Sequence, residues 1–262
     1  MLGKTAAIWL ILASAAMAPL GWARDKQDDE KKKEEEAKAK VAEFKKELKT
    51  CKTEKDMASA IDRLGSALQH PKVLAELRTY LSKGGEVTIA AAEQIGKYKK
   101  DKDAAEALVG AAGGLRDKES IVKCIRYAGD TEYKGIISKL ANLFRHKEVD
   151  AAREAVDSCA KIRTKDAIDP LLGLWKELDG IREEKPDPKG GGGGGIGGVG
   201  GGGLTGAGGV GASMQDEQLK RKRDLTPAVE SALGKITGEN FKDLRAANDW
   251  WRKNKSTFKD PE

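Results

Sequence analysis

Few side chains in this sequence could carry metal or nucleophile chemistry, and their spacing argues against both. The two histidines, His70 and His146, are isolated, and single imidazoles do not make a metal-ligand cluster. The three cysteines, Cys51, Cys124 and Cys159, contain no Cys-x-x-Cys pair, which excludes a zinc ribbon and a thioredoxin-like motif. No Gly-x-Ser-x-Gly nucleophile elbow occurs either. We therefore expect no catalytic residue, no metal site, no cofactor and no enzymatic activity.

The odd number of cysteines leaves at least one thiol without a partner in a monomer. Cys124 and Cys159 could form a disulfide if neighbouring helices bring them together. Alternatively, Cys159 is a small buried side chain, because it lies at helical spacing from Val156 and Ile162. Both alternatives stay open at this stage.

A glycine-rich stretch, residues 189–211, could in principle cradle a phosphate. A Walker motif would need Gly-Lys-Ser or Gly-Lys-Thr at its end, and a dinucleotide fingerprint would need a strand before it; neither is present. Glycine adds no side chain to a core and loses the most entropy on ordering. Together with the stiff Pro186-Asp-Pro188 before it, this composition predicts a long flexible loop over residues 181–213.

Lys220, Arg221, Lys222 and Arg223 form a tight basic cluster just after this loop. The cluster could bind an acidic partner or a phosphate-bearing surface. The alternative is that these residues are the solvated start of a helix. They are our candidate partner-binding residues.

Two adjacent tryptophans near the C-terminus, Trp250 and Trp251, could form an exposed aromatic platform. Together with Ile236, Phe241 and Leu244, however, they fall at spacings that let one face cover the last helices as a cap. We favour the cap. We expect Trp251 to be the buried indole, because it lies two helical turns after Leu244.

The N-terminus has the features of a secretory signal peptide. An uncharged stretch, residues 5–17, follows Lys4, and the small residues Gly21 and Ala23 suit the −3 and −1 positions of a cleavage site. Cleavage after Ala18 is the alternative. The stretch is shorter than the roughly 20 apolar residues that cross a bilayer. We expect export to the periplasm, the cell envelope or the extracellular space, with no membrane span after cleavage.

Composition favours an all-α protein. Charged residues make up 34% of the chain and aromatic residues 5%, and the apolar content is mostly Ala, Leu, Ile and Val. The net charge of +6 is small beside 48 basic and 42 acidic residues, so it is a weak hint of an acidic partner and does not indicate nucleic acid. We expect a protein partner whose identity the sequence does not give.

Apolar residues recur at spacings of three and four beyond a charged N-terminal segment, with breaks of only a few residues. The segment Asp103–Val109 matches Asp166–Leu172 position by position, and another helix lies between the two. The repeat is therefore two helices in about 31 residues, which is a solenoid period. In both copies we expect the Asp to be the helix N-cap. The boundaries we predict are 1–23, signal peptide; 24–53, charged helix or tail; 54–180, helical repeats; 181–213, loop; and 214–262, last repeat and cap.

Helix pairs with this period resemble the HEAT and HEAT-like (PBS lyase-type) repeats over roughly Glu54 to Asp179. The segment Leu233-Gly-Lys-Ile-Thr-Gly-Glu-Asn-Phe241 with the later Trp pair resembles the closing motif of secreted bacterial HEAT-repeat proteins, Leu-Thr-Gly-x-Asn-Phe-Gly before Trp-x-x-Trp-Trp. The sequence departs from that motif at Ile236 and Lys242 and keeps only Trp250-Trp251. The resemblance implies an α-solenoid of antiparallel helical hairpins in the cell envelope, and it transfers no catalytic residue.

A solenoid presents an extended surface, and nothing in the sequence assembles a reactive centre. The function we expect is a non-catalytic protein–protein interaction scaffold of the periplasm or cell envelope. Two alternatives remain: an enzyme or lyase-like member of the HEAT-like repeat family, and a binder of anionic polymers through basic residues. Steep salt dependence of binding would mark the second alternative.

Overall fold

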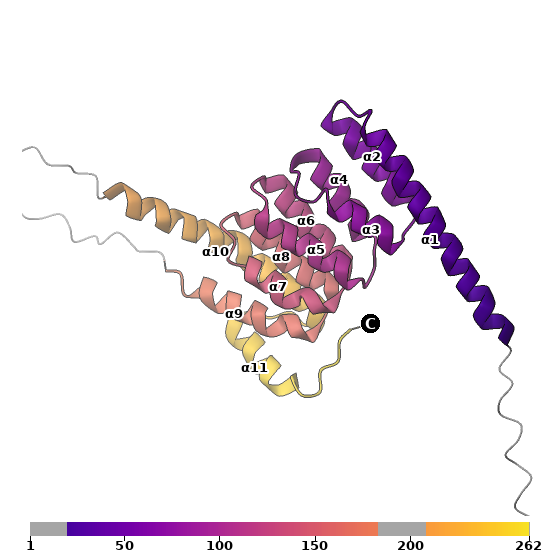
Figure 1. The fold of residues 1–262 in the computed structure, drawn as a ribbon. Helices are drawn as coiled ribbons and strands as arrows, with labels where there is room; N and C mark the ends of the chain where they lie inside the picture. The colour runs from indigo at the N-terminus through magenta and orange to yellow at the C-terminus, as the bar shows by residue number, and fades with distance from the viewer. Residues whose placement is uncertain (1–19, 183–207, 262) are drawn as a thin grey trace, which may run out of the picture.

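A computed structural model of the chain describes residues 20–182 and 208–261 (Figure 1). Within these residues the protein is all-α, which confirms the all-helical part of the predicted fold class. Most of the expected signal peptide and most of the glycine-rich stretch lie outside the described residues. Among the helices described, none combines the length and the apolar character that a bilayer crossing requires.

The described residues form eleven α-helices and two short 3-10 helices, η1 and η2. In chain order they are α1 (Leu20–Leu48), α2 (Glu54–Ala67), α3 (Pro71–Arg78), α4 (Gly85–Gly96), α5 (Lys102–Gly114), α6 (Lys118–Asp130), η1 (Lys134–Ile136), α7 (Ile137–Leu143), α8 (Val149–Ile162), η2 (Lys165–Ala167), α9 (Ile168–Asp179), α10 (Gly208–Thr237) and α11 (Leu244–Asn254).

Side-chain caps fix several helix starts. The Thr53 hydroxyl accepts the Asp56 amide at 3.1 Å while the Asp56 carboxylate accepts the Thr53 amide at 3.1 Å, a reciprocal capping box before α2. Asp101 caps α5 by accepting the Ala104 amide at 2.8 Å, and Asp117 caps α6 in the same way. These caps satisfy amides that have no partner inside the helix.

Both N-caps expected from the repeated segment are wrong. Asp103 lies inside the first turn of α5, because Asp101 two residues earlier already caps that helix. Asp166 lies in η2, and α9 begins at Ile168 without a side-chain cap. The matched apolar positions do lie in the core, since Leu108 and Leu171 are both fully buried.

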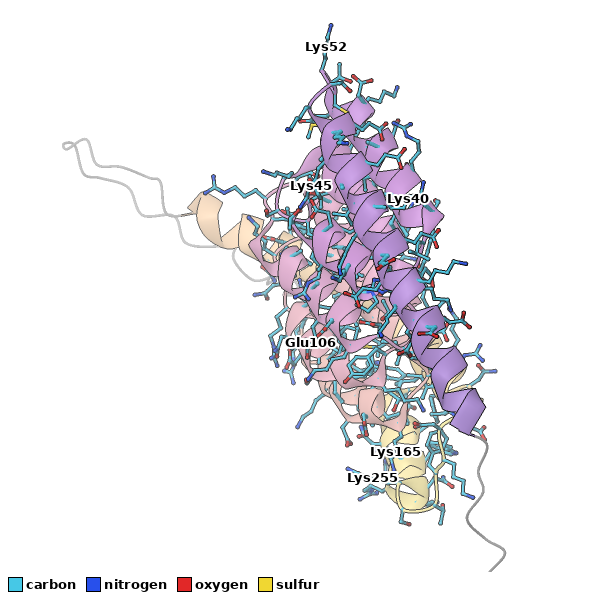
Figure 2. All side chains as sticks on the ribbon, turned by 45° about the vertical axis from the view of Figure 1, so that its right-hand side comes forward. Lys40, Lys45, Lys52, Glu106, Lys165 and Lys255 are labelled. Atoms are coloured by element: carbon cyan, nitrogen blue, oxygen red, sulfur yellow. The ribbon has the colours of Figure 1, made fainter. Side chains whose placement is uncertain are left out.

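The helices pack mainly against their neighbours in sequence and against the next helix but one. The even-numbered helices α2, α4, α6, α8 and α10 contact one another extensively in succession, whereas contacts between successive odd-numbered helices from α3 to α9 are sparse. Figure 1 shows the two long helices, α1 and α10, extending away from opposite sides of this body. Figure 2 shows α1 lying across the front of the stack, with Lys40 and Lys45 along it.

Glycines let successive even-numbered helices approach closely. Gly65 in α2, Gly96 in α4 and Gly129 in α6 each face the next even-numbered helix, where an added Cβ would clash. At Gly129 the clash would reach the backbone, because the Cβ would lie 2.9 Å from the Cα of Ser158. The three positions are about 31 to 33 residues apart, one in each of three successive even-numbered helices.

Three residues other than glycine have left-handed backbone within the described residues. Lys100, Glu132 and Arg163 have φ values of 57°, 58° and 50°, and they follow the ends of α4, α6 and α8 respectively. Left-handed backbone is uncommon for residues other than glycine, and each of these three residues directly precedes the N-cap residue of the next helical segment.

Polar side chains join neighbouring even-numbered helices. The Nε2 atom of Gln94 donates to Asp62 at 2.9 Å, and the guanidinium of Arg126 donates to Glu154 at 2.8 Å; the paired residues are 32 and 28 apart in sequence. Beneath these contacts, the buried apolar side chains form one continuous cluster from Ala37 in α1 to Trp251 in α11. The core is therefore shared by all eleven α-helices of the described residues.

Candidate interaction surfaces

The predicted basic cluster of α10 does not form one open surface, because neighbouring helix residues point about 100° apart. The guanidinium of Arg221 points onto the end of α7, where Nη1 donates to the carbonyl of His146 at 2.8 Å and Nη2 donates to that of Phe144. Carbonyls at helix C-termini have no partner within the helix. Arg221 therefore anchors α10 to the body.

Lys222 has a similar role at the end of α9. Its Nζ donates to the carbonyl of Ile181 at 2.8 Å and to that of Asp179 at 3.4 Å. Lys220 and Arg223 remain exposed, and Arg223 Nε lies 3.5 Å from the Asp224 carboxylate. Two of the four predicted cations are thus accessible and two hold the structure together.

A charged groove runs along α8, and we call it the α8 groove. It has a volume of about 650 Å³. Its lining comes from three even-numbered helices: Arg126 of α6; Arg153, Glu154, Asp157 and Lys161 of α8; and Arg223, Asp224, Pro227, Ala228, Ser231 and Lys235 of α10.

Carboxylates form the floor of the α8 groove. Glu154 is only 8% exposed and accepts two hydrogen bonds from Arg126, at 3.2 and 2.8 Å. This fork-to-carboxylate geometry is the strong form of an ion pair. One helical turn on, Asp157 is half-buried. Burial, and secondarily the charge of Glu154, raise the pKa of Asp157 against the opposing effect of nearby cations.

Cations form the rims of the α8 groove. Arg153, Lys161 and Lys235 are exposed, and Lys161 pairs with Asp130 at 2.8 Å. Among the described residues neither Arg153 nor Lys235 has an ion-pair partner. Five cations and three carboxylates line the groove, so its rims carry a surplus of positive charge.

A second cleft of about 830 Å³ lies between α9, α10 and α11. Its lining includes the Trp175 indole and equal numbers of cations and carboxylates. The hydroxyl oxygen of Thr226, which also lines it, is buried and has no hydrogen-bond partner among the described residues. Balanced charge gives this cleft no preference for either sign of ligand.

The aromatic residues of the predicted cap pack together at the end of the stack. Trp251 is 6% exposed, and its Nε1 donates to Asp169 of α9 at 2.7 Å. Ile236 of α10 is 1% exposed, while Phe241, Leu244 and Trp250 are half-buried. The indole favoured by the sequence spacing is therefore the more buried of the pair.

Sequence reasoning missed the contribution of the last residues to this cap. The Phe258 ring packs edge-on against both indoles, with centroid distances of 5.7 Å to Trp250 and 5.9 Å to Trp251. Lys255, which directly follows α11 and is labelled in Figure 2, donates to Asp169 at 2.9 Å. A single aromatic after a polar run has no periodicity, so no sequence pattern indicated that Phe258 is part of the cap.

Asp260 attaches the C-terminal segment to η1 and to the start of η2. Its carboxylate accepts the Lys165 amide at 2.7 Å, the Lys134 ammonium at 2.6 Å and the Thr164 hydroxyl at 3.3 Å. Partial burial by itself raises the pKa of Asp260, but the hydrogen bonds that it accepts outweigh burial and leave the pKa lowered.

The Asp260 contacts predict acid-sensitive stability. Because its folded pKa lies below the unfolded value of about 3.9, the carboxylate stabilises the fold above that pH and loses its contribution as pH falls through the folded pKa. At pH 7 we expect Asp260→Asn to lower the free energy of unfolding by about 1 kcal/mol. Urea unfolding from pH 7 to pH 2.5 should show the difference from wild type shrinking below about pH 4. A constant difference would contradict this account.

The histidines and cysteines occupy structural positions. His70 Nδ1 accepts the Lys72 amide at the start of α3, and His146 Nδ1 accepts the Glu148 amide before α8. All three cysteines are free thiols, and burial raises the pKa of Cys124 and Cys159 to about 12. A buried thiol with so high a pKa is not a nucleophile at neutral pH.

No protein-family model and no curated protein matches this sequence. What is established about its fold, an all-α protein of packed helices, therefore rests on the structure itself.

Proposed function

We propose that the protein is a non-catalytic protein–protein interaction scaffold of the periplasm or cell envelope, built as a HEAT-like α-solenoid. The recurring left-handed turns, the close-approach glycines and the polar ties between residues about 30 positions apart support the solenoid arrangement. The observation that carries the functional proposal is the α8 groove, a long charged surface that spans three successive even-numbered helices. Solenoids use such surfaces for binding.

The glycine contacts also support a concave even-numbered face. Helices that touch through glycine lie closer together than helices separated by larger side chains. Because even-numbered helices approach at Gly65, Gly96 and Gly129 while contacts between the odd-numbered helices from α3 to α9 are sparse, the stack should curve with the even-numbered face inside. Burial agrees with this, since Glu154 points to the groove and is still only 8% exposed.

Site-specific photo-crosslinking tests the proposal. A photoreactive amino acid at Ser231, which is exposed in the α8 groove, should give a discrete protein adduct in cells of the native host. The matched control is the same amino acid at Gly110, which is exposed on α5 with nothing packed near it. Adducts of equal yield at both positions, or no protein adduct at either, would contradict a scaffold that binds through this face.

The proposed location rests on the N-terminal signal sequence. We expect the exported protein to begin at Arg24, or at Pro19 if the upstream cleavage site is used, because small residues precede both positions. N-terminal sequencing of protein purified from the envelope or the medium measures this directly. Recovery of the chain with Met1 intact in a soluble cytoplasmic fraction would refute export.

The cationic surplus of the α8 groove favours one second candidate, a binder of anionic polymers. The two candidates differ in salt dependence. Binding of a polyanion through several cations releases counterions and weakens steeply with salt, whereas a protein interface that also buries apolar contacts weakens less. Affinity for a model polyuronate, measured at several salt concentrations, distinguishes them.

A further inference from the structure

The α8 groove has exposed positive charge on its rims above a floor of two carboxylates, one of which is paired. Glu154 on the floor is neutralised by its two hydrogen bonds from Arg126. Above it, Arg153 and Lys235 are exposed and have no ion-pair partner within the described residues. Carboxylates of a bound molecule would meet these two cations from opposite sides of the groove, one on α8 and one on α10.

Asp157 gives the groove a second recognition element. Its side chain is half-buried, and within the described residues its carboxylate accepts no hydrogen bond. Its carboxylate is an acceptor only when ionised, so a bound molecule must supply a donor at this point. The backbone N–H of an extended peptide is such a donor.

We infer that the α8 groove binds an acidic, extended peptide segment of a partner protein, its carboxylates on Arg153 and Lys235 and its backbone near Asp157. The inference rests on the proposed function as an interaction scaffold. The dimensions agree. With 14 residues α8 is about 21 Å long, a length that an extended peptide of about six residues spans.

The test uses the mature protein and a fluorescein-labelled synthetic peptide of alternating Asp and Ala, with fluorescence anisotropy as the measurement. We expect binding at about 50 mM salt that weakens as salt rises. The Arg153→Glu and Lys235→Glu double variant should weaken binding by about tenfold or more. A matched control, Lys55→Glu with Lys253→Glu, makes the same change in net charge at exposed positions outside the groove and should bind like wild type.

Two further measurements separate the competing explanations. Lys176→Glu with Arg245→Glu reverses the same charge in the cleft between α9, α10 and α11, and we expect it to leave peptide binding unchanged. The Lys-for-Asp version of the peptide should not bind. Circular dichroism of each variant establishes that it is folded.

Several results would overturn the inference: no binding of the acidic peptide to wild type, equal losses in the groove and control variants, or loss only in the cleft variant. Tighter binding of a polyuronate than of the peptide would also overturn it, in favour of an anionic polymer as ligand. None of these outcomes tests the scaffold proposal, which the crosslinking experiment tests. The scaffold proposal is refuted if Ser231 gives no specific protein adduct. The two failures are therefore distinguishable.

Discussion

Trp251→Ala is expected to lower the free energy of unfolding by about 3–5 kcal/mol, the range for deleting a large buried side chain. The indole is 6% exposed at the end of the stack, where α11 covers α9. Its loss would open a cavity against Phe258 and leave the Asp169 carboxylate without the donor at 2.7 Å. Because the terminal helices have a neighbour on one side only, no other element can close this gap.

Companion variants separate the contributions of Trp251. Trp251→Phe keeps most of the packing and loses the hydrogen bond to Asp169, so we expect a cost of about 1 kcal/mol. Trp250→Ala should cost about 1–2 kcal/mol, less than Trp251→Ala, because Trp250 is half-buried and contacts Phe241 and Phe258 edge-on. Urea unfolding followed by far-UV circular dichroism measures all three. Stability unchanged in both alanine variants would contradict the cap and favour an exposed aromatic platform.

Gly129→Ala should destabilise the protein by about 1–3 kcal/mol although it adds a single methyl group to a helix. The new Cβ would lie 2.6 Å from the Ser158 hydroxyl and 2.9 Å from the Ser158 Cα, so α6 and α8 must separate. Separation would also strain the hydrogen bond that Ser158 donates to the Ile125 carbonyl at 2.9 Å. In an exposed helix the same substitution is stabilising, because glycine is the poorer helix former.

The matched control for this variant is Gly110→Ala in α5. Gly110 is exposed and has nothing within 4 Å of an added Cβ, so we expect a gain of about 0.5–1 kcal/mol. In urea unfolding, we expect the change in the free energy of unfolding to have opposite signs in the two variants, although the chemical change is the same. A gain in stability for Gly129→Ala would show that α6 and α8 do not pack so closely that only glycine fits between them. It would also remove the argument for a concave face.

The sequence by itself determined the helical class and most of the buried positions. Spacings of three and four place apolar residues on one side of a helix wherever that helix is packed, so Leu108 and Leu171 could be assigned to the core without knowing their neighbours. The same logic identified Trp251, because the apolar stripe of α11 is a local property. Helix starts were less determinable: Asp101 and Asp103 are equally good caps by type, and backbone geometry chose the first.

Only the tertiary structure decided which charged residues share a surface. Arg221 and Lys222 are adjacent to Lys220 and Arg223 in sequence, yet α10 turns the first two onto the ends of α7 and α9 and leaves the other two exposed. Conversely, Arg153 and Lys235 lie far apart in the chain and line one groove. Most charged side chains are exposed wherever they lie on a helix, so their spacing in the sequence does not show which of them share a surface. That grouping depends on which helices pack together, and helix packing depends on contacts such as those at Gly129.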